Sequence, residues 1–314
     1  MPDRDSYFPP ASEPVPEAPP IETPPLPQDD PRLTLLLCLA DDELVIGHRH
    51  SEWTGWAPHL EEDLAFSSIA QDEMAHARLL YELAEPITER DATSLGLGRR
   101  PDEYRHSVIC ERPNGDWGYT IARQWLYDEA DDVRTAALET SAWKELRDAL
   151  AVIRMEERYH LDHGRTWFRR VAEGGVTARD RLAGGLEVAV PEAMALFEAF
   201  PGEEALLSDG VLARPSSDLL AEWLDRIGSD LESVSLDYVL TGHARLGEFV
   251  PTSSGEVEER DELTIPGVER RDGRWVHVGG FAGTGGRHGR HSEDFGPLWE
   301  EMTALHRAFP GASW

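Results

Sequence analysis

Length, composition and charge narrow the class of protein. A chain of 314 residues with 40% hydrophobic content can bury a large core, and its formal net charge of -30 argues against nucleic acid, whose phosphates need clustered Lys and Arg. There is no apolar run of about eighteen residues and only Cys38 and Cys110 occur, so we expect no membrane span, disulfide framework or thiolate-held cluster. The first residues lack the basic and apolar regions of a secretion signal, which makes the cytosol the expected location.

The N-terminal segment changes character near residue 30. Residues 1–29 are acidic and rich in Pro, and we expect them to be disordered, which leaves 30–314 as one helical domain. Asp30 can cap a helix that begins at Pro31, because Pro is favoured in a first helical turn. The stretch LTLLLCLADDELVIGHRH is too apolar for a surface helix, so a buried helix is expected up to a break at 56–58.

Three more long helices are predicted, each with its own end signals. They are expected at about 58–85, 117–140 and 142–173. Pro86 should end the first of them, and a connection with a short helix near DEYRHS should follow. Gly164 is expected to interrupt the last helix, and the pair Gly174 and Gly175 to end it.

The last third of the chain is predicted to be more irregular. Two helices are expected at about 177–199 and 215–234, and GPLWEEMTALHRAF should form a final one. Between them, 235–295 is an irregular insert with a short hairpin in TIPGVERRDGRWVHVGG and a loop in GGFAGTGGRHGRH. Because strands and helices do not alternate, the pattern predicts an all-α fold.

Two copies of the pattern Glu-x-x-His lie on separate long helices. Glu73 and His76 form the first pair, and Glu157 and His160 the second. Residues three apart on a helix project from one face, where a single metal ion can contact both. One copy alone would be weak evidence, since exposed helices carry Glu and His by chance.

The other two long helices each offer a carboxylate. One carboxylate per helix, with a His on two of them, is the ligand inventory of a two-metal site in a four-helix bundle. Paired irons bind such oxygen and imidazole ligands and keep positions open for dioxygen. Apolar neighbours indicate burial, where an acid costs several kcal/mol unless a cation compensates it. The predicted ligands are Glu43, Glu73, His76, Asp128, Glu157 and His160.

Four further acids lie close to these ligands in sequence. Asp72 and Glu156 each precede a ligand Glu, and each could accept the free ring N–H of the ligand His from the opposite pair. The alternative is that both are solvated helix acids. Asp131 and Asp132 compete with Asp128 for the third-helix position, and we expect them to be exposed or at the rim of the site.

Clustered basic residues elsewhere have simpler interpretations. The tract Arg287-His288-Gly289-Arg290-His291 could bind metal or phosphate, but a mobile polar loop is the favoured interpretation. The Arg pairs at 99–100 and 169–170 could contact a coenzyme A phosphate, although exposed Arg pairs are usually just solvated.

The residues that carry these motifs resemble a known family. The segments LADDELVIGHRHSEWTGWAPHLEEDLAFSSIAQDEMAHARLLYELAE, ERPNGDWGYTIARQWLYDEAD, EERYHLDHGRTWFRR and GRHSEDFGPLWEEMTALHRAFPGASW are similar to the phenylacetic acid catabolic family, the ferritin-like subunits of the multicomponent phenylacetyl-CoA 1,2-epoxidase. The resemblance extends over most of 33–314. It implies a ferritin-like four-helix bundle with extra C-terminal helices.

The resemblance points to two different subunits of that family. The terminal segment and the PNG turn look like the non-catalytic, structural subunit, which typically lacks part of the ligand set. Glu43 and the pair Glu73 and His76 are nevertheless present here, as in the catalytic subunit. By that resemblance the six predicted ligands would hold the two metal ions.

Three hypotheses for function follow. The first is a diiron monooxygenase or epoxidase component that holds two iron ions, with manganese as the alternative, and acts on an aromatic acyl-CoA. It would work in an oligomer with a related ferritin-like subunit and would receive electrons from a separate reductase, because the chain shows no flavin, nicotinamide or cluster signature. The second is a non-catalytic structural subunit of such a complex. The third is a stand-alone ferritin-like protein that handles iron or peroxide.

Overall fold

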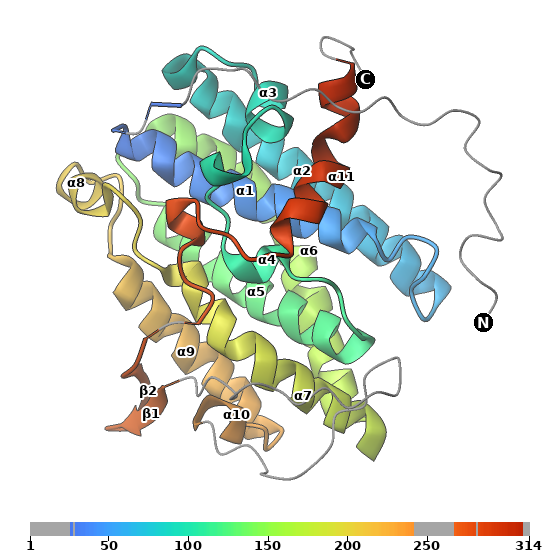
Figure 1. Ribbon diagram of the computed structural model, residues 1–314. Coiled ribbons are helices and arrows are strands. Elements are labelled where there is room, and N and C mark those ends of the chain that lie inside the picture. Colours follow the sequence, from blue (N-terminus) through green and yellow to red (C-terminus); the bar gives the residue numbers. More distant parts are fainter. Residues whose placement is uncertain (1–25, 28, 242–266, 281, 310–314) are drawn as a thin grey trace, which may run out of the picture.

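The chain folds around a bundle of four long helices, α1, α2, α5 and α6, with shorter elements against its outside (Figure 1). The computed structural model describes residues 26–27, 29–241, 267–280 and 282–309. The elements are α1 Pro31–Ser51, α2 Leu60–Thr88, α3 Ala92–Leu97, η2 Pro101–Glu103, α4 Val108–Glu111, α5 Trp117–Ala137, α6 Lys144–Ala172, α7 Val176–Ala193, η3 Met194–Phe197, α8 Glu203–Ser208, α9 Ser216–Ser233, α10 Tyr238–Thr241, β1 Val268–Arg271, β2 Arg274–His277, η4 Gly286–His288 and α11 Phe295–Ala308. The expected all-α, ferritin-like class is confirmed. The predicted disordered tail lies almost entirely outside the described residues, as does much of the predicted insert.

Helix α1 is buried on nearly every side, which explains its apolar sequence. Asp30 caps it as predicted, accepting hydrogen bonds from the backbone N–H groups of Arg32 at 2.8 Å and Leu33 at 3.2 Å. Helix α2 packs along one side of α1, and α4 and α8 contact others. Because the helix is enclosed, its polar residues also lie in the interior, among them three consecutive acids at 41–43.

Two of the predicted helix breaks are wrong. Helix α2 continues through Pro86 to Thr88, since a Pro in the last turn costs few intrahelical hydrogen bonds. Helix α6 runs through Gly164 without interruption. A Cβ atom at Gly164 would lie 2.5 Å from Oδ2 of Asp128, so glycine serves close packing of α6 against α5 instead of breaking the helix.

The connection between α2 and α5 differs from the helix expected near DEYRHS. The segment 104–107 is extended, and the helical pieces α3, η2 and α4 lie on either side of it. Its backbone is held by α1: the N–H of Arg105 donates to Asp41 at 2.6 Å and that of Ser107 to Asp42 at 2.8 Å. Acceptors on a distant helix therefore replace the hydrogen bonds that a local helix would have formed.

The C-terminal third wraps around the bundle. The predicted hairpin is present as the antiparallel pair β1 and β2, and Trp275 of β2 packs against Gly228 of α9, where any Cβ would clash with the indole ring. Helix α11 packs against α3 and η2, far from the hairpin (Figure 1). Among the described residues, no helix has both the length and the apolar character that a membrane crossing requires.

Candidate metal centre

The centre of the bundle collects acids and imidazoles from four helices. Glu43, Glu73, His76 and Glu157 each place one ligand atom in a group that spans no more than 4.8 Å, and all four side chains are buried. Helix α1 supplies the first, α2 the next two and α6 the last. The structure thus brings four of the six predicted ligands together at one point. The other two, Asp128 on α5 and His160 on α6, are buried beside them.

Each imidazole of the cluster, a predicted metal ligand, is oriented by an acid from the opposite helix. Nε2 of His76 on α2 lies 2.8 Å from Oε2 of Glu156 on α6. Nε2 of His160 on α6 lies 3.4 Å from Oδ2 of Asp72 on α2. A carboxylate accepts hydrogen bonds, so each ring carries a proton on Nε2. This is the crossed arrangement in which an outer carboxylate fixes the tautomer of a ligand His.

The other ring nitrogen of each imidazole faces carboxylate oxygens. Nδ1 of His76 is 3.0 Å from Oε1 of Glu157 and 3.4 Å from Oε2 of Glu43. Nδ1 of His160 is 3.2 Å from the same Glu157 oxygen and 3.6 Å from Oε1 of Glu73. With the proton on Nε2, a lone pair on Nδ1 would point at acceptors. Only a cation between them, either a second ring proton or a metal ion, makes this arrangement favourable.

Several buried atoms of the cluster have no hydrogen-bond partner among the described residues. Such atoms cost free energy unless something compensates them. They are Oε2 of Glu43, both carboxylate oxygens of Glu73 and of Asp128, Oε1 of Glu157, and Nδ1 of His76 and His160. All are oxygen or imidazole ligand atoms of the kind that divalent iron and manganese bind, so the residues fit a metal pair.

The acid–base properties of the cluster report the same crowding of negative charge. Burial and the charges of Glu43 and Glu157 raise the pKa of Glu73 well above its usual value. Burial disfavours the charged form of His76, but Glu157 and Glu43 raise its pKa to about 11. Likewise Glu157 and Asp72 overcome burial and raise the pKa of His160 to about 10. The excess of negative charge therefore favours the binding of protons or of metal cations at this site.

Asp128 lies at the α5 side of the cluster, outside the tightest group. Its carboxylate rests against Gly164 of α6, and burial raises its pKa well above the usual value, although His160 acts in the opposite direction. Its charge interacts with those of His160 and Glu157. Asp128 is thus positioned with the His160 half of the cluster, while Glu43 is positioned with the His76 half.

Two neighbours of the cluster were not identified as site residues from the sequence. The hydroxyl of Tyr127 donates to Oε1 of Glu43 at 3.0 Å, which orients that carboxylate from α5. Asp131 was expected to be exposed or at the rim of the site; it is buried, its charge interacts with those of Glu43 and Glu157, and one of its oxygens accepts from Arg134 at 3.2 Å. Asp132, in contrast, is partly exposed and pairs with Arg154 and Arg226. The position of Tyr127 directly before Asp128 could have marked it as a neighbour of the site. Asp131 lies three residues after Asp128 on the same helix, so the sequence did not decide which of the two acids faces the cluster.

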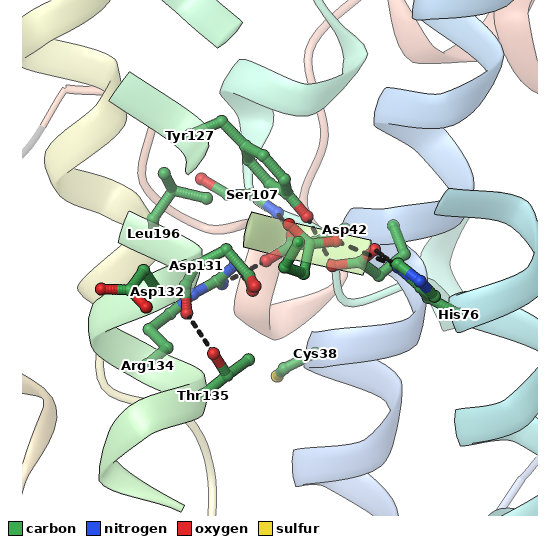
Figure 2. Close-up of polar contacts among 12 residues, drawn as sticks. Cys38, Asp42, His76, Ser107, Tyr127, Asp131, Asp132, Arg134, Thr135 and Leu196 are labelled. Carbon is green, nitrogen blue, oxygen red and sulfur yellow. Dashed lines mark hydrogen bonds and ion pairs between the residues drawn. The ribbon is translucent and has the colours of Figure 1, made fainter. Parts of the chain in front are cut away.

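The acid next to Glu43 is fully compensated by arginines. Figure 2 shows Asp42 beside Arg134, with the site residues Tyr127 and His76 close by. Asp42 accepts from Arg134 at 2.5 Å and from two nitrogens of Arg287 at 2.9 and 2.8 Å. Although burial opposes it, Arg287 and Arg134 lower the pKa of Asp42. The expectation of a mobile loop at 287–291 is therefore wrong for Arg287, which is buried at the centre of the fold.

A second arginine also departs from the sequence prediction. Arg99 was expected to be solvated, but its guanidinium is fully buried and pairs with Asp41, which also accepts from the Tyr81 hydroxyl at 2.5 Å. Arg99 is therefore a structural partner of α1 and is not free to contact a coenzyme A phosphate.

A second group of potential metal ligands joins the connection between α2 and α5 to the segment before α11. Glu111 Oε2 is 2.6 Å from Nε2 of His106 and 3.0 Å from Nδ1 of His291. The two imidazoles stack, with centroids 4.1 Å apart and planes inclined by 15°. Nearly parallel planes do not converge on one ion close to both nitrogens. The hydrogen bonds to Glu111 account for the group, and we interpret it as structural.

Three cavities in the described part of the chain were compared with the space that an aromatic substrate requires. None of these three is both large enough for an aromatic ring and located beside the cluster. A cavity of about 50 Å³ touches Arg134, Arg287 and Cys38, and it is much smaller than an engineered cavity of about 150 Å³ that binds benzene. A cavity of about 310 Å³ is lined by α9, β2 and the η3 region instead of the ligand helices. The third, of about 110 Å³, lies near Leu26 and Glu103.

Comparison with known proteins agrees with this architecture. The chain is similar to a component of 1,2-phenylacetyl-CoA epoxidase from Escherichia coli (strain K12), the subunit designated C, with 28% identity over 279 residues that cover 88% of this chain and 97% of that protein. The family model for phenylacetic acid catabolic proteins matches residues 16–247. Those residues include the four helices that carry the predicted ligands. The chain therefore belongs to the phenylacetic acid catabolic protein family.

Proposed function

We propose that this protein is the metal-binding subunit of an epoxidase-type oxygenase that acts on an aromatic acyl-CoA, in the cytosol. The observation that carries the proposal is the group formed by Glu43, Glu73, His76 and Glu157. The imidazole of His76 directs Nδ1 toward these carboxylates and donates from Nε2 to Glu156, an arrangement suited to holding a cation. The substrate class comes from similarity to the family and to the epoxidase subunit.

The residues of the chain have separable roles in this proposal. Glu43, Glu73 and His76 would hold the metal pair together with Asp128, Glu157 and His160. A pair of iron ions would supply the activation of dioxygen when bound. Glu156 and Asp72 keep the imidazoles oriented, and Tyr127 keeps Glu43 oriented. The buried side chains of Ile69 and Ala70 on α2 help to keep water from the cluster.

The reaction needs reducing equivalents from outside the chain. Insertion of one atom of dioxygen into the substrate, with the other released as water, consumes two electrons and two protons. No flavin, nicotinamide or cluster signature is present in the sequence, so the electrons would come from a separate reductase.

Metal analysis of the purified protein after anaerobic reconstitution tests the proposal. We expect about two equivalents of iron or manganese per chain. Glu73→Ala and His160→Ala should lose most of that metal, whereas Glu145→Ala, an exposed acid on the same helix as His160, should retain it. Retention of neither metal by the wild-type protein would refute the proposal.

A structural, non-catalytic role in the same complex is the second candidate. Two observations favour it: the terminal segment and the PNG turn resemble the structural subunit of the family, and none of the three cavities gives an aromatic ring room beside the cluster. The two candidates separate in a reconstituted complex. If Glu73→Ala abolishes metal binding but leaves epoxidation intact, the site is vestigial and the structural role is correct.

A further inference from the structure

Helix α6 exposes a stripe of apolar side chains that no other described element covers. Val152, Met155 and Tyr159 are 56%, 70% and 51% exposed. Their spacing of three and four residues places them on one face of the helix. Other positions of α6 are covered, for example where Arg154 and Arg165 pair with acids of α5. Exposed apolar groups gathered on one face mark interaction sites more often than single ones do.

The stripe lies directly outside the ligand imidazoles. Glu156 lies between Met155 and the proposed ligand Glu157 in sequence. Its side chain is 52% exposed, and its Oε2 accepts a hydrogen bond from Nε2 of His76. Asp72, 32% exposed, contacts His160 from α2 in the same way. On this side, each path from solvent to the buried cluster passes through a single carboxylate and the imidazole hydrogen-bonded to it. We call the surface formed by Asp72, Val152, Met155, Glu156 and Tyr159 the α2–α6 face.

We propose that the α2–α6 face is the docking surface for the electron-donating partner, a reductase with a basic, partly apolar contact surface. This inference rests on the proposed function. A second copy of this chain fits poorly, because a two-fold contact would bring Asp72 and Glu156 of one copy close to the same two acids of the other, on chains of net charge -30. Carboxylates around an apolar centre favour a partner with Lys and Arg at the corresponding positions.

The size and place of the face also suit electron transfer. Electron-transfer encounters bury small areas, at the low end of protein interfaces, and three apolar side chains with two acids form such a patch. A donor bound here would lie outside His76 and His160, on the side where few atoms separate solvent from the cluster. It would deliver the two electrons that each turnover consumes, one turnover reducing one dioxygen to the inserted atom and water.

Binding of the purified reductase to the full-length, metal-loaded chain tests the proposal. Met155→Glu and Val152→Glu should each raise the dissociation constant about tenfold or more, because they place a desolvated charge at the centre of the contact. Val176→Glu is the matched control: Val176 is 76% exposed at the start of α7, away from the face, and its variant should bind within about twofold of wild type. Raising the salt concentration should weaken wild-type binding.

Each outcome decides the proposal. Wild-type affinity in Met155→Glu, or a wild-type chain that does not bind the reductase, would overturn it. The proposal would also fail if these variants bound the reductase with wild-type affinity but changed the oligomeric state of the chain or bound the related ferritin-like subunit more weakly. Another copy or that subunit would then be the partner that covers the face. Metal content and reduction by dithionite are measured on the same samples. If wild type holds metal that dithionite reduces, the proposed function stands even where docking fails; if it holds none, that function fails independently of the affinities.

Discussion

Three consecutive buried acids on α1 meet two different fates. Asp41 and Asp42 are surrounded by donors, from Arg99 and Tyr81 in the first case and from Arg134 and Arg287 in the second. Glu43, the next residue, has one oxygen bonded to Tyr127 and the other facing His76 and further carboxylates. Buried arginines thus pair with the first two acids, whereas no arginine among the described residues pairs with the third.

The difference distinguishes a structural charge from a binding site. A buried carboxylate with its arginines in place is complete, and removal of either partner leaves an uncompensated charge. A buried group of carboxylates without arginines is complete only when a cation arrives. Side chains that look alike in sequence are thus expected to respond in opposite ways to substitution and to metal removal.

Removal of the compensated acid should have the largest effect on stability. Asp42→Ala leaves the guanidinium groups of Arg134 and Arg287 buried with one partner fewer, and we expect a loss of about 3–5 kcal/mol in the free energy of unfolding. Chemical denaturation measures it. Asp148→Ala removes a 61% exposed acid and should change stability by less than about 0.5 kcal/mol. A loss below about 1 kcal/mol in Asp42→Ala would show that the pairing is not structural.

The compensated group at Glu111 predicts sensitivity to acid. Burial and the neighbouring His291 lower the pKa of His106 to about 4 from an ordinary 6.5. A histidine with a lowered pKa binds its proton in the unfolded state first, so stability should fall as pH drops from about 6.5 to about 4, by at most about 3 kcal/mol. Urea titrations across this window measure the slope. His106→Asn should flatten the profile, and an unchanged slope would contradict the assignment; the exposed His59→Asn is the control.

The outer acids should affect metal affinity more than folding. Glu156→Ala removes the acceptor that orients His76, and we expect metal affinity to fall about 10–100-fold. Because this side chain is half exposed, the free energy of unfolding of the metal-free protein should change by less than about 1 kcal/mol. Competition with a metal chelator gives the affinity. The same loss of affinity in Glu145→Ala would point to a general charge effect instead.

The smallest expected effect has the opposite sign. Glu73→Gln keeps the shape of the side chain and removes a carboxyl whose pKa burial and the nearby acids raise on folding. Folding of the metal-free variant no longer requires this group to bind a proton or to keep a charge among other acids, so it should be more stable by about 1 kcal/mol at neutral pH. Thermal unfolding in the presence of a chelator measures this. A destabilised Glu73→Gln would place Glu73 with Asp42 among the compensated acids and remove the contrast between the two regions.

Local sequence was enough to predict the all-α class and the positions of the four long helices, because helical periodicity, capping at Asp30 and the hairpin signal are local properties of the chain. It also singled out Glu73, His76, Glu157 and His160, since their spacing on a helix fixes a common face before any packing is known. Gly164 shows the limit: a helix breaker by propensity, it is tolerated within α6 because Asp128 occupies the space of a side chain.

Which charges are compensated could be known only from the folded structure. Arg287 lies 245 residues after Asp42, in a Gly-rich tract with no local signal, and nothing in the sequence pattern distinguishes the buried Arg99 from the partly exposed Arg100. The crossed contacts of Glu156 with His76 and of Asp72 with His160 likewise depend on how α2 and α6 pack. Pairing of buried charges is set by contacts between distant segments, so residue spacing identifies candidate ligands while the fold determines which of them lack a partner.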